Sequence, residues 1–282
     1  MIQCVMKYGA EVGPRLILLL GTLLAISGCG GGAPPAPAPI SPPLNYTPNG
    51  NWLLVGNQPK EQYPIISAAL IVSGNQVIAS GLMETACGEG IGEYPFYLTG
   101  PVAPGGSSQL ASIPPDASIT ISGVLPASGA TTWSGTYTDN CGINQSGPFT
   151  ATVLPALSGT YKGTLQGGSA GQGMTVTFSQ GAATSATNGG FTLYYLPLSV
   201  TVTITGSPCF THGTSIAGYS TYYGPSEIYG AGVDGAVLMD NGSQLGFMGS
   251  FSAPDESTID FGLAAPGGAC NWNNYGGTLT RQ

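Results

Sequence analysis

The chain carries very little charge, and positive charge is especially scarce. It has 5 Lys and Arg against 13 Asp and Glu in 282 residues, or 6% charged residues, where about 25% is usual. Nucleic-acid binding requires a basic surface, so this function is excluded. Histidine occurs once, at His212. Catalytic zinc commonly needs about three protein ligands, and we therefore expect neither metal nor cofactor.

No segment shows helical periodicity over about 12 residues. Apolar residues make up 42% of the chain, which argues against ordinary disorder. The 46 Gly and 23 Pro residues separate short runs of alternating pattern. The sequence therefore predicts an all-β protein.

The first residues have the pattern of an export signal. Lys7 and Arg15 precede an uncharged apolar run, Leu16–Ile26, which is too short for a stable membrane span. Ile26-Ser27-Gly28-Cys29 follows directly. This tetrapeptide resembles the lipobox of bacterial lipoproteins.

The resemblance implies that residues 1–28 are a signal peptide and that Cys29 is acylated, with a membrane as partner. Because Gly30 rather than Asp follows Cys29, it also implies a cell envelope location at the outer membrane. A single acyl chain anchors only reversibly, so several chains are needed for stable attachment. Residues 29–48 contain seven prolines and are predicted to be an extended tether.

Short strands are predicted through the rest of the chain. In 199–205 hydroxyl and β-branched residues alternate, which places Val200, Val202 and Ile204 on one buried face. Apolar residues flank Asn241-Gly242 in 236–247, and 66–72 and 76–82 flank a second turn. Both patterns are typical of β-hairpins.

The two halves of this region are similar to each other. Trp52 and Tyr161 follow glycine near equivalent first strands, and Cys141 and Cys270 each precede a glycine by six residues. We therefore predict two tandem antiparallel repeats, residues 49–157 and 158–282, each a β-barrel or a β-sandwich. Whether the repeats pool their strands into one body stays open.

The repeat also selects a disulfide pairing. Four cysteines allow three connectivities, and the similar separations Cys87–Cys141 and Cys209–Cys270 favour one bridge within each half. The late Cys-x5-Gly motif and the Ser158-Gly159-Thr160-Tyr161 opening resemble repeat lipoproteins of acidobacterial type. That family has no assigned activity, so the resemblance implies architecture and location only.

Catalytic chemistry has little support in the sequence, and we predict a protein that is not an enzyme. The single histidine, His212, could serve a catalytic serine, but the sequence contains no Gly-x-Ser-x-Gly nucleophile elbow. Glu84, Glu89 and Glu93 lie close together in the sequence, as acids in a solvated loop do. Calcium ligation by Asp234, Asp240 and Asn241, or by Asp255, Glu256 and Asp260, is an alternative, but neither set has the EF-hand order.

Aromatic side chains are the best candidates for binding. They lie in the segment 217–232 and just after Cys270: Tyr219, Tyr222, Tyr223, Tyr229, Trp272 and Tyr275. Tyr and Trp beside amide groups can stack on sugars or contact proteins. The simpler interpretation is a long loop that packs its own rings over the barrel.

We therefore expect a lipid-anchored, non-catalytic envelope protein that binds a glycan or a protein partner. The alternatives are a carrier that holds a small apolar ligand inside a barrel, and a hydrolase that uses Glu84, Glu89 or Glu93.

The lipid anchor is directly testable. We expect wild-type chain to incorporate labelled palmitate and to fractionate with membranes, and Cys29→Ser to do neither, because the serine hydroxyl cannot replace the thiol as lipid acceptor. Labelling and fractionation in the bacterial host measure both properties, and Cys4→Ser is the control that should behave as wild type. Equal labelling of the Cys29→Ser variant would contradict the prediction.

Overall fold

In the computed structural model, the residues described are 49–56, 65–85, 92–112, 119–139, 145–166, 172–188, 191–220, 223–252, 255–264 and 274–282. These residues contain strands, turns and bends but no helix, as the sequence predicts. No helix able to span a membrane occurs in these ranges. Residues 43–282 form one compact unit.

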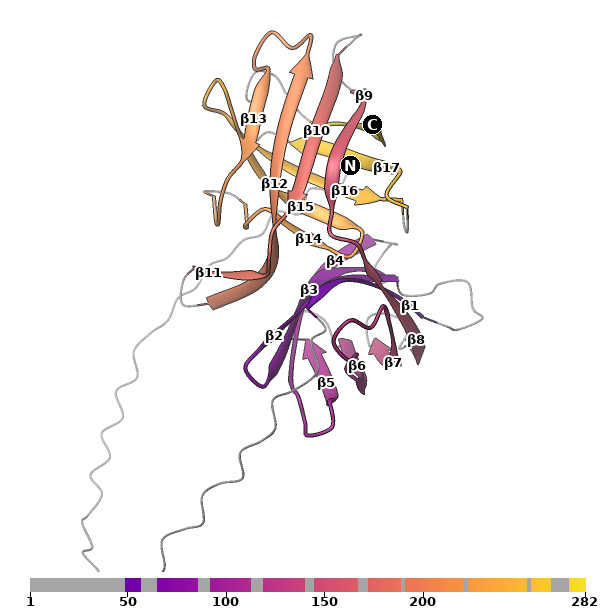
Figure 1. The fold of residues 1–282 in the computed structure, drawn as a ribbon. Helices are drawn as coiled ribbons and strands as arrows, with labels where there is room; N and C mark the ends of the chain where they lie inside the picture. Colours follow the sequence, from indigo (N-terminus) through magenta and orange to yellow (C-terminus); the bar gives the residue numbers. More distant parts are fainter. Residues whose placement is uncertain are drawn as a thin grey trace, which may run out of the picture. The chain divides into compact units, whose positions relative to one another are not determined.

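The first barrel is a closed meander of eight strands (Figure 1). Each strand pairs antiparallel with its neighbour in the sequence, and the last pairs with the first. The strands are β1 (Gly50–Gly56), β2 (Ile65–Ser73), β3 (Gln76–Thr85), β4 (Gly92–Pro101), β5 (Ser107–Ser112), β6 (Ile119–Val124), β7 (Thr132–Asp139) and β8 (Gln145–Leu154).

The second barrel has the same meander with two additions. Strands β9, β10, β12, β13, β15, β16, β17 and β18 form a closed antiparallel ring, because β10 also pairs β12. Strand β11 extends one end of β12, and the short β14 pairs with β12 and β15. The bounds are β9 (Ser158–Thr164), β10 (Gly173–Gln180), β11 (Thr184–Asn188), β12 (Phe191–Thr205), β13 (His212–Ser215), β14 (Glu227–Tyr229), β15 (Gly232–Met239), β16 (Gln244–Phe251), β17 (Thr258–Ala264) and β18 (Asn274–Arg281).

The predicted repeats are thus barrels, and several predicted details are confirmed. Trp52 and Tyr161 lie in the first strand of their barrels and are buried. The Asn241-Gly242 turn joins β15 to β16, and Gly74-Asn75 joins β2 to β3. In β12 the predicted inward residues Val200, Val202 and Ile204 are all buried.

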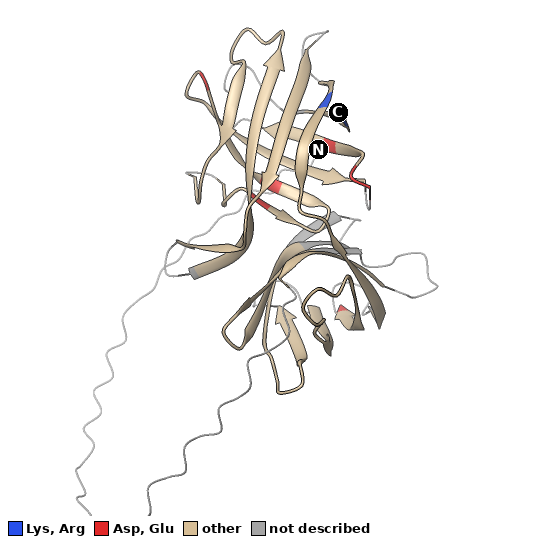
Figure 2. Cartoon of the chain, viewed as in Figure 1, with Lys and Arg blue, Asp and Glu red and all other residues tan. Residues whose placement is uncertain are grey.

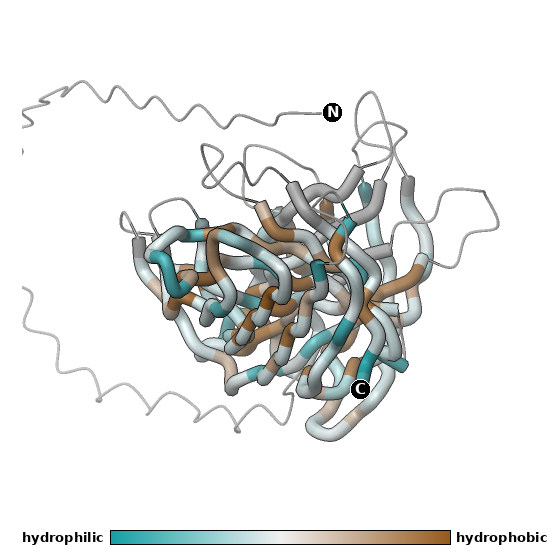
Figure 3. The backbone as a smooth tube through the Cα atoms, turned by 90° about the horizontal axis from the view of Figure 1, so that it is seen from above, coloured by the Kyte–Doolittle hydropathy of each residue, from teal (hydrophilic) through white to brown (hydrophobic). Residues whose placement is uncertain are grey.

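Aromatic rings pack against one another inside both barrels. In the first, Trp133 lies edge-on to Trp52 and Phe149, with centroids 6.3 and 5.0 Å away. In the second, Phe178 contacts Tyr161 and Phe251 at 5.6 Å. Apolar residues alternate with polar ones along the strands (Figure 3), so burial of apolar area rather than charge pairing stabilises each barrel.

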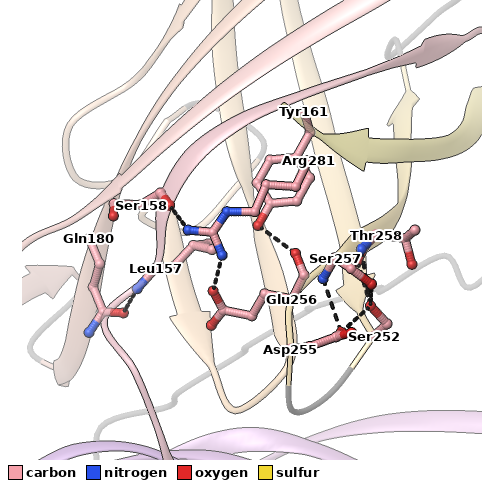
Figure 4. A network of polar contacts seen from close by, with 10 residues as sticks. All are labelled: Leu157, Ser158, Tyr161, Gln180, Ser252, Asp255, Glu256, Ser257, Thr258 and Arg281. Atoms are coloured by element: carbon pink, nitrogen blue, oxygen red, sulfur yellow. Dashed lines mark hydrogen bonds and ion pairs between the residues drawn. The ribbon is translucent and has the colours of Figure 1, made fainter.

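A polar network lies where β18 closes on β9 (Figure 4). The Arg281 guanidinium donates to the Ser158 carbonyl at 2.7 Å and pairs with Glu256 at 3.5 Å. The Tyr161 hydroxyl donates to the Glu256 carbonyl at 3.0 Å. This is the one ion pair found among the described residues. It lies at the seam that makes the sheet a barrel.

One amide side chain connects the two barrels. The Asn51 amide nitrogen donates to the Gly230 carbonyl at 2.7 Å, and the Gly230 N–H donates to the Asn51 oxygen at 2.5 Å. Asn51 lies in β1 and Gly230 between β14 and β15, and both are buried. Strands β12 and β14 contact the first barrel at the same junction, and Ala69 of β2 belongs to the apolar cluster of the second barrel.

Of the four cysteines in the predicted disulfide bonds, only Cys209 lies in the described residues. Cys209 is disulfide-bonded, and it packs partly buried against the core of the second barrel. Cys87, Cys141 and Cys270 lie outside the described residues, so the pairing itself stays a prediction, as does the lipid on Cys29.

The Asn51 contact predicts a measurable stability loss. Asn51→Ala leaves the buried N–H and carbonyl of Gly230 unpaired, which costs about 3 kcal/mol at 1–3 kcal/mol per group. Urea unfolding of the full chain in detergent measures the loss. The matched control is Asn49→Ala, which removes an exposed bond to the Val72 N–H and should cost about 1 kcal/mol or less. Equal losses would contradict this account of the junction.

Candidate functional site

The outer face of the second barrel carries a row of facing residues that begins with two acids. Register pairs Glu227 of β14 with Asp234 of β15, Asp234 with Met248 of β16, and Met248 with Gly262 of β17. Gly262 in turn faces Gly276 of β18. Paired residues in an antiparallel sheet point to the same side. The row therefore presents two carboxyl groups, then the thioether of Met248, and then two glycines that have no side chain.

A second row lies beside the first. Ser250 pairs with Asp260, and Asp260 pairs with Thr278. The Thr278 hydroxyl donates to the Asp260 carboxylate at 2.6 Å, and the three side chains are exposed. This row presents hydroxyl and carboxylate oxygens to solvent.

Both rows, except for Glu227, line an open cleft of about 820 Å³. Met248, which is 66% exposed, stands on one side of the glycine pair Gly262 and Gly276, and the side chain of Gln166 lies beyond it. The floor is flat where the glycines face each other, because no Cβ rises from it. The residues that line the cleft include two carboxylates and no Lys, Arg or His.

Charged residues are few on the strands of both barrels (Figure 2). Of the acid pair, Asp234 lines the cleft, and Glu227 faces Asp234 in register. Glu227 is 6% exposed, and burial together with the neighbouring Asp234 carboxylate raises its pKa well above the usual value. Asp234 retains some exposed surface at the cleft, yet its carboxyl is surrounded closely enough that burial raises its pKa to about 6.

Hydroxyl groups surround the pair. The Tyr229 hydroxyl bonds to the Asp234 carboxyl and favours its ionised form, while the Tyr229 ring covers Gly232, where a Cβ would meet it. Burial, and next the charge of Glu227, raise the pKa values of Tyr195 and Tyr219. Ser80 of β3 comes from the other barrel, and its hydroxyl favours ionised Glu227.

The predicted aromatic cluster is brought together only in part. Tyr219 and Tyr229 both lie near the acid pair. Tyr223 instead packs on Gly246, as the interpretation of a self-packing loop predicts. Tyr222 and Trp272 lie outside the described residues, and for Tyr275 only the backbone of β18 is described.

The remaining candidates are placed apart. Glu84 pairs in register with Glu93 across β3 and β4, but their side chains and Glu89 lie outside the described residues. His212 is exposed in β13.

The two calcium alternatives do not form as sets. Asp240 accepts from the Thr211 hydroxyl at 2.7 Å, and it lies about 20 Å along β15 from Asp234 at ~3.3 Å per residue. Asp255 bonds within its own turn, to Ser252 and Ser257, and Asp260 bonds Thr278. No group of three His, Cys, Asp or Glu able to hold a metal occurs in the described ranges.

Glu227, Tyr195 and Ser80 are not among the predicted site residues, and the strand at 227–229 is not predicted by the pattern. The sequence does hold a signal for them. Glu227 and Asp234 are the two acids in the otherwise uncharged and largely apolar stretch 227–239. Acids in such a stretch are seldom solvated, so they mark a candidate for burial.

Comparison of the chain with protein-family models and with curated protein sequences gave no match.

The raised pKa values predict that the protein is most stable in mild acid. Unfolded Asp has a pKa of about 4 and Asp234 one of about 6, so the folded state binds more protons between these values. The contribution is fully present below pH ~4 and is lost as pH rises through ~6, by up to about 3 kcal/mol. Glu227 acts with the same sign at higher pH.

Asp234→Asn mimics the protonated acid, so we expect its thermal midpoint to vary less between pH 4.5 and pH 8 and to exceed that of wild type at pH 8. Thermal unfolding in the presence of EDTA measures this. The control is Asp240→Asn, since a hydrogen bond from Thr211 lowers the pKa of Asp240 and the acid-side gain of wild type should persist. A variant with the wild-type pH profile would show that Asp234 is not the group responsible.

Proposed function

We propose that this chain is a lipid-anchored, non-catalytic envelope protein that binds a glycan in the cleft on the outer face of its second barrel. The observation that carries the proposal is the cleft itself, with hydroxyl and carboxylate oxygens on one side, an exposed thioether on the other, and a floor of glycine backbone.

Each part of the cleft matches the chemistry of a sugar ring. Asp260 accepts hydrogen bonds, and Ser250 and Thr278 both donate and accept them, as sugar hydroxyls require. The glycine pair allows a flat ring to approach the backbone. Met248 offers an apolar and adaptable contact to the C–H face of the ring.

The alternative of a carrier with an apolar interior receives less support. The described interior side chains of both barrels are buried and include interlocking aromatic rings. A small eight-stranded barrel has an interior just wide enough for its own side chains or for one small ligand, and here aromatic rings occupy part of that space.

The anchor and the disulfides complete the proposal. Lipid on Cys29 and the tether 29–48 would hold the barrels at an envelope membrane. The disulfide bond of Cys209 is expected in an exported protein, and it supports the proposed pairings Cys209–Cys270 and Cys87–Cys141. Each bridge would contribute about 4 kcal/mol by the loop-closure model.

Glycan binding can be tested by placing a large side chain on the floor of the cleft. At position 262, opposite the exposed Met248, Gly262→Leu places a side chain on the floor of the cleft and should weaken binding at least tenfold, or about 1.4 kcal/mol. Titration calorimetry of the full chain in detergent against cellohexaose, chitohexaose and xylohexaose measures this. Gly224→Leu is the matched control, because a Cβ there has no neighbour within 4 Å. If wild type bound none of these glycans, or if both variants bound equally, the proposal would be wrong.

A further inference from the structure

Two buried oxygen atoms at the junction of the barrels have no hydrogen-bond partner. They are Glu227 Oε2 and Ser80 Oγ, in side chains only 6% and 2% exposed. The Ser80 hydroxyl faces the Glu227 carboxyl closely enough to favour its charged form, yet the two atoms form no well-oriented hydrogen bond. Buried polar atoms are nearly always satisfied, and exceptions often mark a water or an ion.

The oxygens that meet here come from three strands. Ser80 belongs to β3 of the first barrel, Glu227 to β14 and Asp234 to β15. Register places Glu227 directly opposite Asp234, so their side chains leave the sheet on the same face. The Ser80 hydroxyl approaches from the other side of the junction, because β14 contacts β2 and β3.

No protein cation balances the pair within the part of the chain that the structure describes. The groups that affect the Glu227 carboxyl are Asp234 and Ser80, and around them are the phenols of Tyr195, Tyr219 and Tyr229. Arg281 is engaged by Glu256 and Ser158 at the seam. Water would satisfy the orphan atoms but would not offset the repulsion between two carboxylates.

We propose that Glu227, Asp234 and Ser80 bind a calcium ion at the junction of the two barrels, independently of glycan binding. Carboxylate and hydroxyl oxygens are hard ligands, which calcium prefers. Calcium takes 6–8 oxygens, and water can supply the remainder because Asp234 opens onto the cleft. The cleft is also the path of entry.

Calcium fits better than the other common ions. Zinc prefers nitrogen and sulfur ligands, and none of the three residues supplies either. Magnesium requires near-ideal octahedral geometry at short distances, which side chains from two separate barrels are poorly placed to provide. With only two carboxylates, the affinity should fall in the weak range of extracellular modules, roughly 10⁻⁴–10⁻³ M.

Bound calcium would act as a cross-link between the barrels. It would join β3 to β14 and β15 beside the Asn51–Gly230 contact, and it would stabilise the ionised form of both acids. The pH dependence measured with EDTA should therefore diminish when calcium is present.

The full chain, purified in detergent and stripped with EDTA, is titrated with calcium chloride at pH 7.5 and constant ionic strength. We expect one calcium per chain by calorimetry and a saturable rise in the thermal midpoint. Glu227→Gln should lower calcium affinity at least tenfold, and Ser80→Ala by a smaller factor. The matched control is Asp255→Asn, an exposed acid bonded only within its own turn, which should respond as wild type does.

Several outcomes would overturn the proposal. One is the absence of any calcium-dependent shift in wild type. Another is an equal shift from magnesium or sodium chloride, which would indicate simple screening of a net charge of −8. The third is an equal calcium response of Glu227→Gln and Asp255→Asn. Should Glu227→Gln fail to fold, the calorimetric affinity of Ser80→Ala and Asp234→Asn decides, since unchanged affinity in both contradicts the site.

Discussion

Closure of each sheet is the constraint on which this structure depends. An open sheet leaves a row of unpaired backbone groups at each edge, and a chain with so few charged residues has little else with which to protect an edge. The first barrel closes along β1 and β8 over six residue pairs. The second closes through only two pairs of β9 and β18, Lys162–Thr280 and Tyr161–Arg281, with a bridge from Gln166 to Gly276. At this seam the side-chain contacts of Arg281 with Ser158 and Glu256 add to the few backbone pairs between β9 and β18.

Glycines also allow the close approach of the two strands at this seam. At Gly163 a Cβ would lie 2.6 Å from the Thr278 carbonyl oxygen, and at Gly277 it would lie 2.5 Å from that of Thr164. These approaches are possible only for glycine, so β9 and β18 meet along bare backbone. Gly163 and Gly277 pair with the buried Met174 and Phe261, so they face the interior. The floor of the cleft is the neighbouring outward pair Gly262 and Gly276.

Local pattern was sufficient for the all-β class and for several strands and turns, but closure into barrels and the site depend on contacts that no local pattern encodes. Alternation in 199–205 and the Asn241-Gly242 turn correctly predicted an inward face and a hairpin, because period and turn chemistry are properties of neighbouring residues. The prediction failed at 227–229, since a three-residue strand is too short for alternation to be visible. Ser80 and Glu227 are 147 positions apart, and Asn51 and Gly230 are 179 apart. Such partners become neighbours only after both barrels have closed.

The two repeats share a meander, and the site lies where the second departs from it. Strand β14 has no counterpart in the first barrel, and together with the long β12 it makes the principal contacts between the barrels. It also supplies Glu227, whose burial next to Asp234 is unfavourable by itself. Conflicts of this kind persist where function or a bound ion compensates for them. An insertion that both joins two barrels and buries an acid pair is therefore better explained as a binding element than as a means of packing, for which an apolar residue at position 227 would serve.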